Sequence, residues 1–257
     1  MSITNQIIPT ISNLIENTES SVSVTELLPG EIEGVSTTCL DILGPCVFVD
    51  SARIDVYNVF LVLNGQGSIR CGEDFRSICK DTIVRMPHGQ TYSIEVNAES
   101  KLSLLRIRTT LGPEDLAVIH KNPKLHGKIY VKAFADCPQY TEDTKSESTI
   151  NRMFLPEHYV PRFCMGYVET QGPDAVKPHS HPMLEQLFLG LDSCRCFCHA
   201  DGEQALLTEK MLLHIPLGSE HSVSVEKGNV LKYIWMDFFF TLEGQKYMDE
   251  QHVMITP

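Results

Sequence analysis

Apolar residues in this chain are grouped in short runs, many of which alternate with polar residues. The runs are enriched in β-branched and aromatic residues and are separated by Gly, Asn and Asp. Such alternation is typical of strands with one buried face, and regular spacing of such strands is typical of sandwiches and barrels. The pattern therefore predicts an all-β protein with little helix. The clearest runs are residues 46–51, 57–67, 82–90, 101–109, 162–172, 185–192, 194–203, 210–221 and 230–240.

The runs form two groups separated by a segment of different character. Near its start, Pro113 is followed by two acidic residues, which is typical of the first turn of a helix, and we expect a short helix through Lys121. Residues 141–149 are polar without apolar periodicity and are expected to form a loop. We therefore predict an N-terminal domain at 21–108, a connection at 109–150 and a C-terminal domain at 151–257.

The two groups of runs can be aligned with each other. Residues 87–92 have the same Pro-x-Gly spacing as residues 216–221, and each segment follows a short apolar run. Residues 57–67 likewise parallel residues 185–194. A weak repeat of roughly 130 residues is too long for a solenoid and indicates two copies of one β-domain.

Net charge and composition argue against several classes of partner. The chain has 21 Lys and Arg against 33 Asp and Glu, a formal charge of −12, so we expect no nucleic-acid partner. The first twenty residues contain no Lys or Arg, and no run of 18 apolar residues occurs, so we expect neither a secretory signal nor a membrane partner. Nine cysteines without a disulfide framework are typical of reduced thiols, and we expect a cytoplasmic protein.

Two blocks in the last third of the chain carry donors for a metal. In the first, His179 and His181 would project from one face of a strand, and Pro182 would end that strand and let Glu185 return from the next one. In the second, a Pro-x-Gly corner precedes His221, which would begin a strand and face inward. Three imidazoles and a carboxylate form a complete ligand set for one divalent ion of iron, manganese, nickel, cobalt or zinc.

The spacing His-x-His-x3-Glu, followed later by Pro-x-Gly-x2-His, resembles the two signature motifs of the cupin superfamily. The resemblance is close over residues 165–238 and looser over the whole chain, which is similar to a two-domain bicupin with a single complete metal motif. It implies two double-stranded β-helix, or jelly-roll, barrels in tandem. It also implies one divalent transition metal held inside the second barrel by His179, His181, Glu185 and His221.

The N-terminal half departs from this pattern. Aligned with the second half, it has Ser51, Arg53, Tyr57 and Tyr92 at the positions of the four donors, which is a poor ligand set for a divalent ion. We therefore expect a degenerate cupin barrel without a metal, which serves stability or dimerisation. The alternative is that Arg53, Tyr57 and Tyr92 line a cavity for an organic anion.

Two further residues are candidates for catalysis. Lys177 precedes the first motif and on a continuous strand would point toward the mouth or the inside of the barrel. A cation there could orient a carboxylate substrate or stabilise an enolate or alkoxide, and a solvated lysine is the alternative. His214 precedes the second motif and would act as a general base, or else as a structural histidine. Cys194, Cys196 and Cys198 share one face of a strand, and we interpret them as buried thiols, with a redox or soft-metal role as the alternative.

These features together indicate a mononuclear-metal protein, and we expect an enzyme that acts on a small oxygenated organic acid. Its reaction would be a dioxygenation, or a non-redox lyase, isomerase or hydrolase reaction in which the metal is a Lewis acid. A metal-containing binding or sensor protein without turnover is the alternative, and a structural barrel that retains unused ligands is a third possibility. The expected partner is a small anionic ligand, and the expected assembly is a homodimer.

Overall fold

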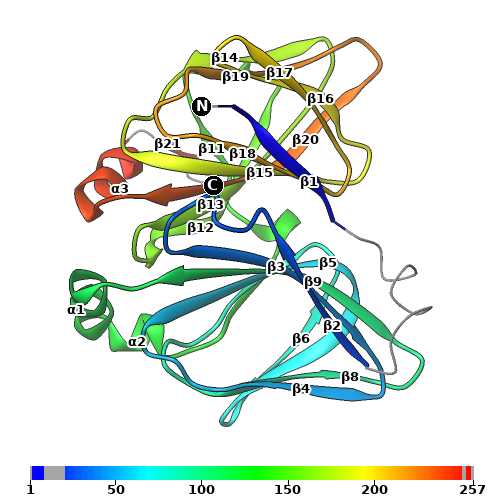
Figure 1. Ribbon diagram of the computed structural model, residues 1–257, viewed down its shortest axis with the longest axis vertical. Helices are drawn as coiled ribbons and strands as arrows, with labels where there is room; N and C mark the ends of the chain where they lie inside the picture. The colour runs from blue at the N-terminus through cyan, green and yellow to red at the C-terminus, as the bar shows by residue number, and fades with distance from the viewer. Residues whose placement is uncertain (1, 9–20, 251–252, 256–257) are drawn as a thin grey trace. The chain divides into compact units, whose positions relative to one another are not determined.

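The computed structural model describes residues 2–8, 21–250 and 253–255 (Figure 1). The chain forms two compact units: Pro9–Asp136, called here the N-terminal barrel, and Met1–Ile8 with Cys137–Pro257, called the C-terminal barrel. Antiparallel strands dominate both units, which confirms the all-β prediction. The division after Asp136 falls inside segment 109–150, so that segment is shared between the two units and does not form a separate connection.

The N-terminal barrel is built around one long strand, β5. A sheet with the order β10-β7-β5-β9-β3-β2 contains its first part, and β6 and β8 pair with its second part, while β4 pairs with β8. Leu40, Phe60, Ile94 and Leu104 come from four strands and share one buried apolar cluster, which is the core of this unit. The elements are β2 (Val22–Leu27), β3 (Val35–Leu43), β4 (Cys46–Asp50), β5 (Val56–Cys71), β6 (Asp74–Cys79), β7 (Thr82–Arg85), β8 (Tyr92–Val96), β9 (Lys101–Thr110), α1 (Pro113–Lys121), α2 (Pro123–His126), β10 (Tyr130–Ala133) and η2 (Phe134–Asp136).

Helix α1 begins and ends where the sequence predicts. Pro113 lies in its first turn, and the Asp115 carboxylate accepts a hydrogen bond from the backbone N–H of Gly112 at 2.7 Å, which satisfies a donor that the helix itself leaves open. The helix runs to Lys121. Within the described residues, no helix has both the length and the apolar character needed to cross a membrane.

The C-terminal barrel consists mainly of two antiparallel sheets. The larger has the strand order β1-β18-β15-β20-β13-β12, and the smaller has the order β14-β19-β16-β17. Strand β1 comes from the start of the chain and pairs with β18, with Thr4 opposite His214. The elements are β1 (Thr4–Ile7), β11 (Tyr140–Thr141), β12 (Ile150–Val160), β13 (Phe163–Gln171), β14 (Asp174–His179), β15 (Leu184–Gly190), β16 (Arg195–Ala200), β17 (Glu203–Thr208), β18 (Met211–Ile215), β19 (His221–Val225), β20 (Val230–Phe239), α3 (Leu242–Asp249) and β21 (Val253–Met254).

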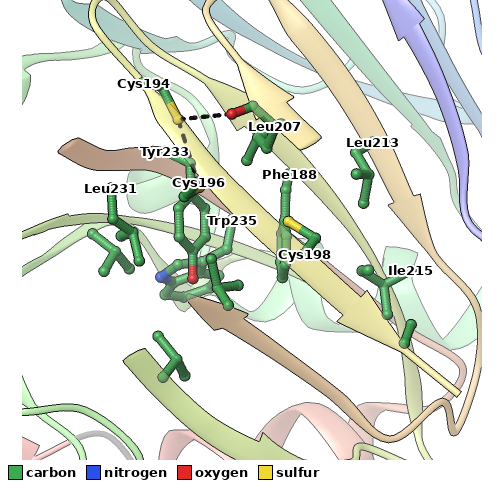
Figure 2. Close-up of a cluster of buried hydrophobic side chains, with 14 of the residues drawn as sticks. Phe188, Cys194, Cys196, Cys198, Leu207, Leu213, Ile215, Leu231, Tyr233 and Trp235 are labelled. Atoms are coloured by element: carbon green, nitrogen blue, oxygen red, sulfur yellow. Dashed lines mark hydrogen bonds between the residues drawn. The ribbon is translucent and has the colours of Figure 1, made fainter. Parts of the chain in front are cut away.

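The core of the C-terminal barrel lies between these two sheets (Figure 2). Phe188 and Leu213 enter it from the larger sheet, and Cys196 and Cys198 enter it from the smaller one. Cys194 and Cys196 have their sulfur atoms 3.8 Å apart, and this contact together with burial raises the pKa of the Cys194 thiol. The sulfur atoms are therefore protonated at neutral pH and fill space among apolar side chains, which agrees with the packing interpretation.

Candidate metal centre

Three histidines meet where strands β14 and β19 lie side by side. His179 is the last residue of β14, His221 is the first residue of β19, and the two are directly opposite each other in the ladder. His181 follows in the turn before β15. The ligand atoms of the three residues lie within 4.8 Å of one another, and the ring centres of His179 and His221 are 4.4 Å apart. The structure thus brings together three of the four donors that the sequence predicts.

Hydrogen bonds to the backbone fix the orientation of two of these rings. Nδ1 of His179 lies 2.7 Å from the carbonyl oxygen of Lys177, and Nδ1 of His221 lies 3.0 Å from that of Ser219. A carbonyl oxygen only accepts, so Nδ1 carries the proton in both rings and Nε2 carries the lone pair. This arrangement prepares Nε2 for a metal, since ligating histidines usually donate their other N–H to such a partner.

His221 has the burial and charge state that a ligand needs. Its side chain is 3% exposed, and no described residue forms a hydrogen bond with its Nε2 atom. Burial and the neighbouring His179 lower the pKa of His221 to about 4, so the ring is neutral at physiological pH. A buried lone pair without a partner costs free energy, and a bound cation would remove that cost.

Gln186 supplies a fourth donor to the same cavity. This cavity has a volume of about 30 Å³ and is lined by Gln186 together with the three histidines. The side-chain nitrogen of Gln186 lies 2.8 Å from a carboxylate oxygen of Asp237, which can only accept, so the amide oxygen faces elsewhere. That oxygen is buried and has no hydrogen-bond partner among the described residues. Three imidazole nitrogens and one amide oxygen suit a divalent transition metal.

Glu185 does not join the histidines, which corrects the predicted ligand set. Successive residues of a strand face opposite sides, so with Gln186 toward the cavity Glu185 lies on the other face of β15. There its carboxylate lies 3.4 Å from Nε2 of His214. His214 is buried on that same face, because its neighbours Leu213 and Ile215 point into the core. The proposed general base is therefore not among the residues that line the cavity.

Lys177 is also placed away from the centre. In the ladder between β14 and β19, Val176 is opposite Val223, but the next pair joins His179 with His221. The extra residue is a β-bulge, which reverses the alternation between Val176 and His179. Lys177 consequently faces outward, is exposed, and donates a hydrogen bond to the carbonyl oxygen of Asp143 at 2.9 Å. The prediction that it points with His179 fails because β14 is not continuous.

The structure adds residues that the sequence pattern did not reveal. Glu142 and Lys145, from the polar segment expected to be only a loop, line the cavity with the histidines. A larger hollow of about 430 Å³, called here the vestibule, is lined by residues 141–144, 179–183, Tyr247, Met248 and Glu250. Glu142, His179, His181 and Met248 line both spaces, so the vestibule leads to the centre. Only the strong polarity of residues 141–149 could have drawn attention to this segment.

The N-terminal barrel has an ion-pair network at the corresponding register. Tyr92 is opposite Asp50, as His221 is opposite His179, so Asp50 and not Ser51 corresponds to His179. Tyr92 donates to the Asp50 carboxylate at 2.6 Å, and Arg108 pairs with the same group. Arg108 also donates to Asn58, its partner across the ladder, at 2.8 Å. A guanidinium thus lies among side chains that match the metal donors in position.

This network also bears on the predicted anion cavity of the N-terminal barrel. Arg53 is exposed and pairs with Asp55 at 2.5 Å. Tyr57 is buried, and its hydroxyl lies 2.9 Å from Nδ1 of His126. Tyr92 is bonded to Asp50, so each of the three residues has a different side chain as its partner.

Comparison with known proteins agrees with this geometry. No protein-family model and no curated protein sequence matches the chain. Solved structures match it over most of its length. A cupin 2 conserved barrel domain protein from Leptotrichia buccalis aligns with a TM-score of 0.64 at 14% identity, covering 91% of this chain and 96% of that one. The chain has a cupin fold.

Other solved structures align over similar lengths. A putative glyoxylate-induced protein from Pseudomonas aeruginosa gives a TM-score of 0.67 at 11% identity, with 84% of this chain and 78% of that chain covered. Vicilin from hazelnut, Corylus avellana, aligns with a TM-score of 0.60 at 13% identity, covering 92% of this chain and 83% of the vicilin chain. At such identities the likeness establishes the cupin fold alone, and the activity has to be argued from the site.

Proposed function

We propose that this chain is a mononuclear-metal protein of the cupin fold, in which His179, His181 and His221, with Gln186 as a fourth donor, hold a divalent transition metal. We further propose that it acts on a small oxygenated organic acid. The convergence of three histidine donors within 4.8 Å, two of them with Nδ1 bonded to the backbone, carries this proposal. Surface histidines without a ligand role would not need such an arrangement.

A bound divalent metal would supply Lewis-acid chemistry, or redox chemistry if it is iron. The side chains of this protein would hold the ion and leave it open toward the vestibule, where a ligand can enter. None of the four proposed donors is an anionic group, since three are imidazole nitrogens and one is an amide oxygen. The ion would therefore keep its full positive charge, which favours an anionic ligand.

Metal analysis of variants tests the proposal. Wild-type protein purified without chelator should contain about one equivalent of transition metal, and His181→Ala should contain less than about a tenth of that, because two remaining imidazoles bind far more weakly. His199→Ala is the matched control: His199 lies in the same barrel, and its Nε2 lies 2.8 Å from the Ser224 hydroxyl, outside the cluster. Equal metal content in both variants would contradict the proposal.

Turnover separates an enzyme from a binding protein. The protein would be loaded in turn with iron(II), manganese, nickel and zinc, and incubated with a panel of small hydroxy and oxo acids, while oxygen uptake and product formation are followed. An enzyme converts at least one compound in a metal-dependent manner, and His181→Ala abolishes that conversion. Tight binding without conversion or oxygen uptake would instead support a metal-containing binding or sensor protein.

A further inference from the structure

Lys145 is a buried charge beside the candidate metal centre. Its side chain is 6% exposed, although lysine is almost never buried without a reason. It lines the small cavity with the histidines and with apolar side chains such as Val176 and Phe188. Removing an ammonium group from water costs free energy unless its hydrogen bonds are replaced. The hydrogen-bond partners of Lys145 therefore indicate whether the protein alone satisfies this group.

The protein satisfies only part of the hydrogen-bonding capacity of Lys145. Nζ donates to the Glu142 carboxylate at 2.7 Å and to the Tyr140 hydroxyl at 3.0 Å. An ammonium group has three hydrogens, and no described residue accepts the third. Lys145 therefore has one donor left, on a side chain that lines the cavity of the three histidines.

The surroundings of Lys145 hold it in place. The Tyr140 hydroxyl also accepts a hydrogen bond from the indole nitrogen of Trp235 at 3.1 Å, which ties it to strand β20. Glu142 accepts a second bond from the Thr144 hydroxyl at 2.6 Å. A cation fixed in this way is suited to receive an anionic group without reorganisation.

The vestibule limits what else the ligand can carry. Three carboxylate residues, Glu142, Asp143 and Glu250, line it, and none of its lining residues is Lys or Arg. A second acidic group on the ligand would lie near these carboxylates and be repelled. Lys145 is the only Lys or Arg among the described residues that line the small cavity, so the site offers one fixed cation to one acidic end of a ligand. The vestibule favours a neutral or cationic remainder.

We propose that Lys145 anchors the ligand of this site by donating its third hydrogen bond to the carboxylate of a small acid. A neighbouring hydroxyl or carbonyl oxygen of the same acid would reach the metal, and the acid would carry a single carboxylate. This assignment rests on the proposed metal centre. It makes Lys145 the residue that selects for a 2-hydroxy or 2-oxo monocarboxylate, a role that Lys177 cannot have because it faces outward.

Binding of two probe acids to cobalt-loaded protein tests the assignment. Glycolate carries one carboxylate and one hydroxyl, and tartronate carries an additional carboxylate. Titration calorimetry, with the visible absorption of cobalt(II) as a second readout, should show glycolate binding to wild type and tartronate binding less tightly. Lys145→Met should keep one equivalent of cobalt and bind glycolate at least about tenfold more weakly, since a charge-assisted hydrogen bond is lost. Lys177→Met, the control, should bind glycolate as wild type does.

Each outcome has a distinct meaning. If Lys145→Met retains cobalt and binds glycolate as tightly as wild type, or if cobalt-loaded wild type binds no glycolate, the role of Lys145 is wrong while the metal centre stands. If wild type holds no cobalt, the metal centre fails and the anchor with it. The single substitution leaves the partly buried Glu142 without its cation. Glu142→Gln combined with Lys145→Met removes both charges and gives the same test should the single variant not fold.

Discussion

Two adjacent residues of β15, Glu185 and Gln186, show that the face of the strand on which a residue lies determines whether it can be a ligand. Glu185 has the better donor for a divalent metal, but its carboxylate lies beside His214 on the face away from the cavity. Gln186 lines the cavity, and its amide nitrogen donates to Asp237. Its amide oxygen is buried and has no hydrogen-bond partner among the described residues. The motif spacing predicts the correct strand but selects Glu185, whereas the next residue, Gln186, faces the cavity. A shift of one residue along a strand moves the side chain to the opposite face.

Substitution of Gln186 should therefore affect metal binding, whereas substitution of Glu185 should not. We expect Gln186→Ala to weaken metal binding about tenfold or more, because it removes a donor oxygen, while Glu185→Gln should leave the affinity unchanged. Competition with a chromophoric chelator measures both affinities under the same conditions. Loss of affinity in Glu185→Gln alone would restore Glu185 as the ligand and contradict the placement of Gln186.

At the scale of elements, the segment from Cys137 to Thr149 contributes side chains to the candidate site. Asp174, at the start of β14, accepts hydrogen bonds from the hydroxyls of Ser146 and Thr170 at 2.6 and 2.8 Å, and more weakly from Ser148 and Thr149. This carboxylate ties the end of the segment to the strand that leads to His179. Glu142 and Lys145 are thereby held over the cavity by a contact that no local pattern encodes.

Removing this anchor should loosen the segment in a pH-dependent way. Burial raises the pKa of Asp174, but the hydrogen bonds from Ser146, Thr170, Ala175 and Ser148 outweigh it and hold the pKa below 3.8. The carboxylate therefore stabilises the fold above pH 3.8, and this contribution is lost as the pH falls through the lowered pKa. We expect Asp174→Ala to cost about 1–2 kcal/mol at pH 7 and to speed amide exchange at residues 140–149.

Urea unfolding and hydrogen exchange measure these effects. The difference in the free energy of unfolding between wild type and Asp174→Ala should narrow as the pH is lowered below 3.8. A difference that stays constant across this pH range would show that the charge of Asp174 does not hold the segment.

At the scale of the whole molecule, the two barrels have different side chains at corresponding positions of their strand ladders. Where the C-terminal barrel has His179, His221 and Gln186, the N-terminal barrel has Asp50, Tyr92 and Asn58 with Arg108 paired among them. A guanidinium there provides the positive charge for Asp50 from within the protein. The chain is also interleaved, because its first strand, β1, completes the larger sheet of the C-terminal barrel.

Deletion of residues 1–8 should therefore destabilise the barrel that lies later in the sequence. The deletion removes the ladder between β1 and β18 and the side chain of Ile8, which is 2% exposed. Together these changes should cost about 3 kcal/mol, or roughly 10 °C in the melting temperature of the C-terminal barrel. Calorimetry with and without added cobalt identifies that transition, because the metal raises only the stability of the unit that binds it. An unchanged transition would mean that β1 contributes nothing to that barrel.

The sequence by itself determined the all-β class, helix α1 and the histidines of the candidate centre. Each depends on local information: period-two alternation, a first-turn proline with acidic neighbours, and two motifs close to their strands. Only the tertiary structure decided that Gln186 faces the cavity, that a bulge turns Lys177 outward, and that Lys145 returns to the site from a polar segment. These outcomes depend on register and on contacts between residues far apart in the chain, where one residue of offset reverses a side chain and no short pattern records the partner.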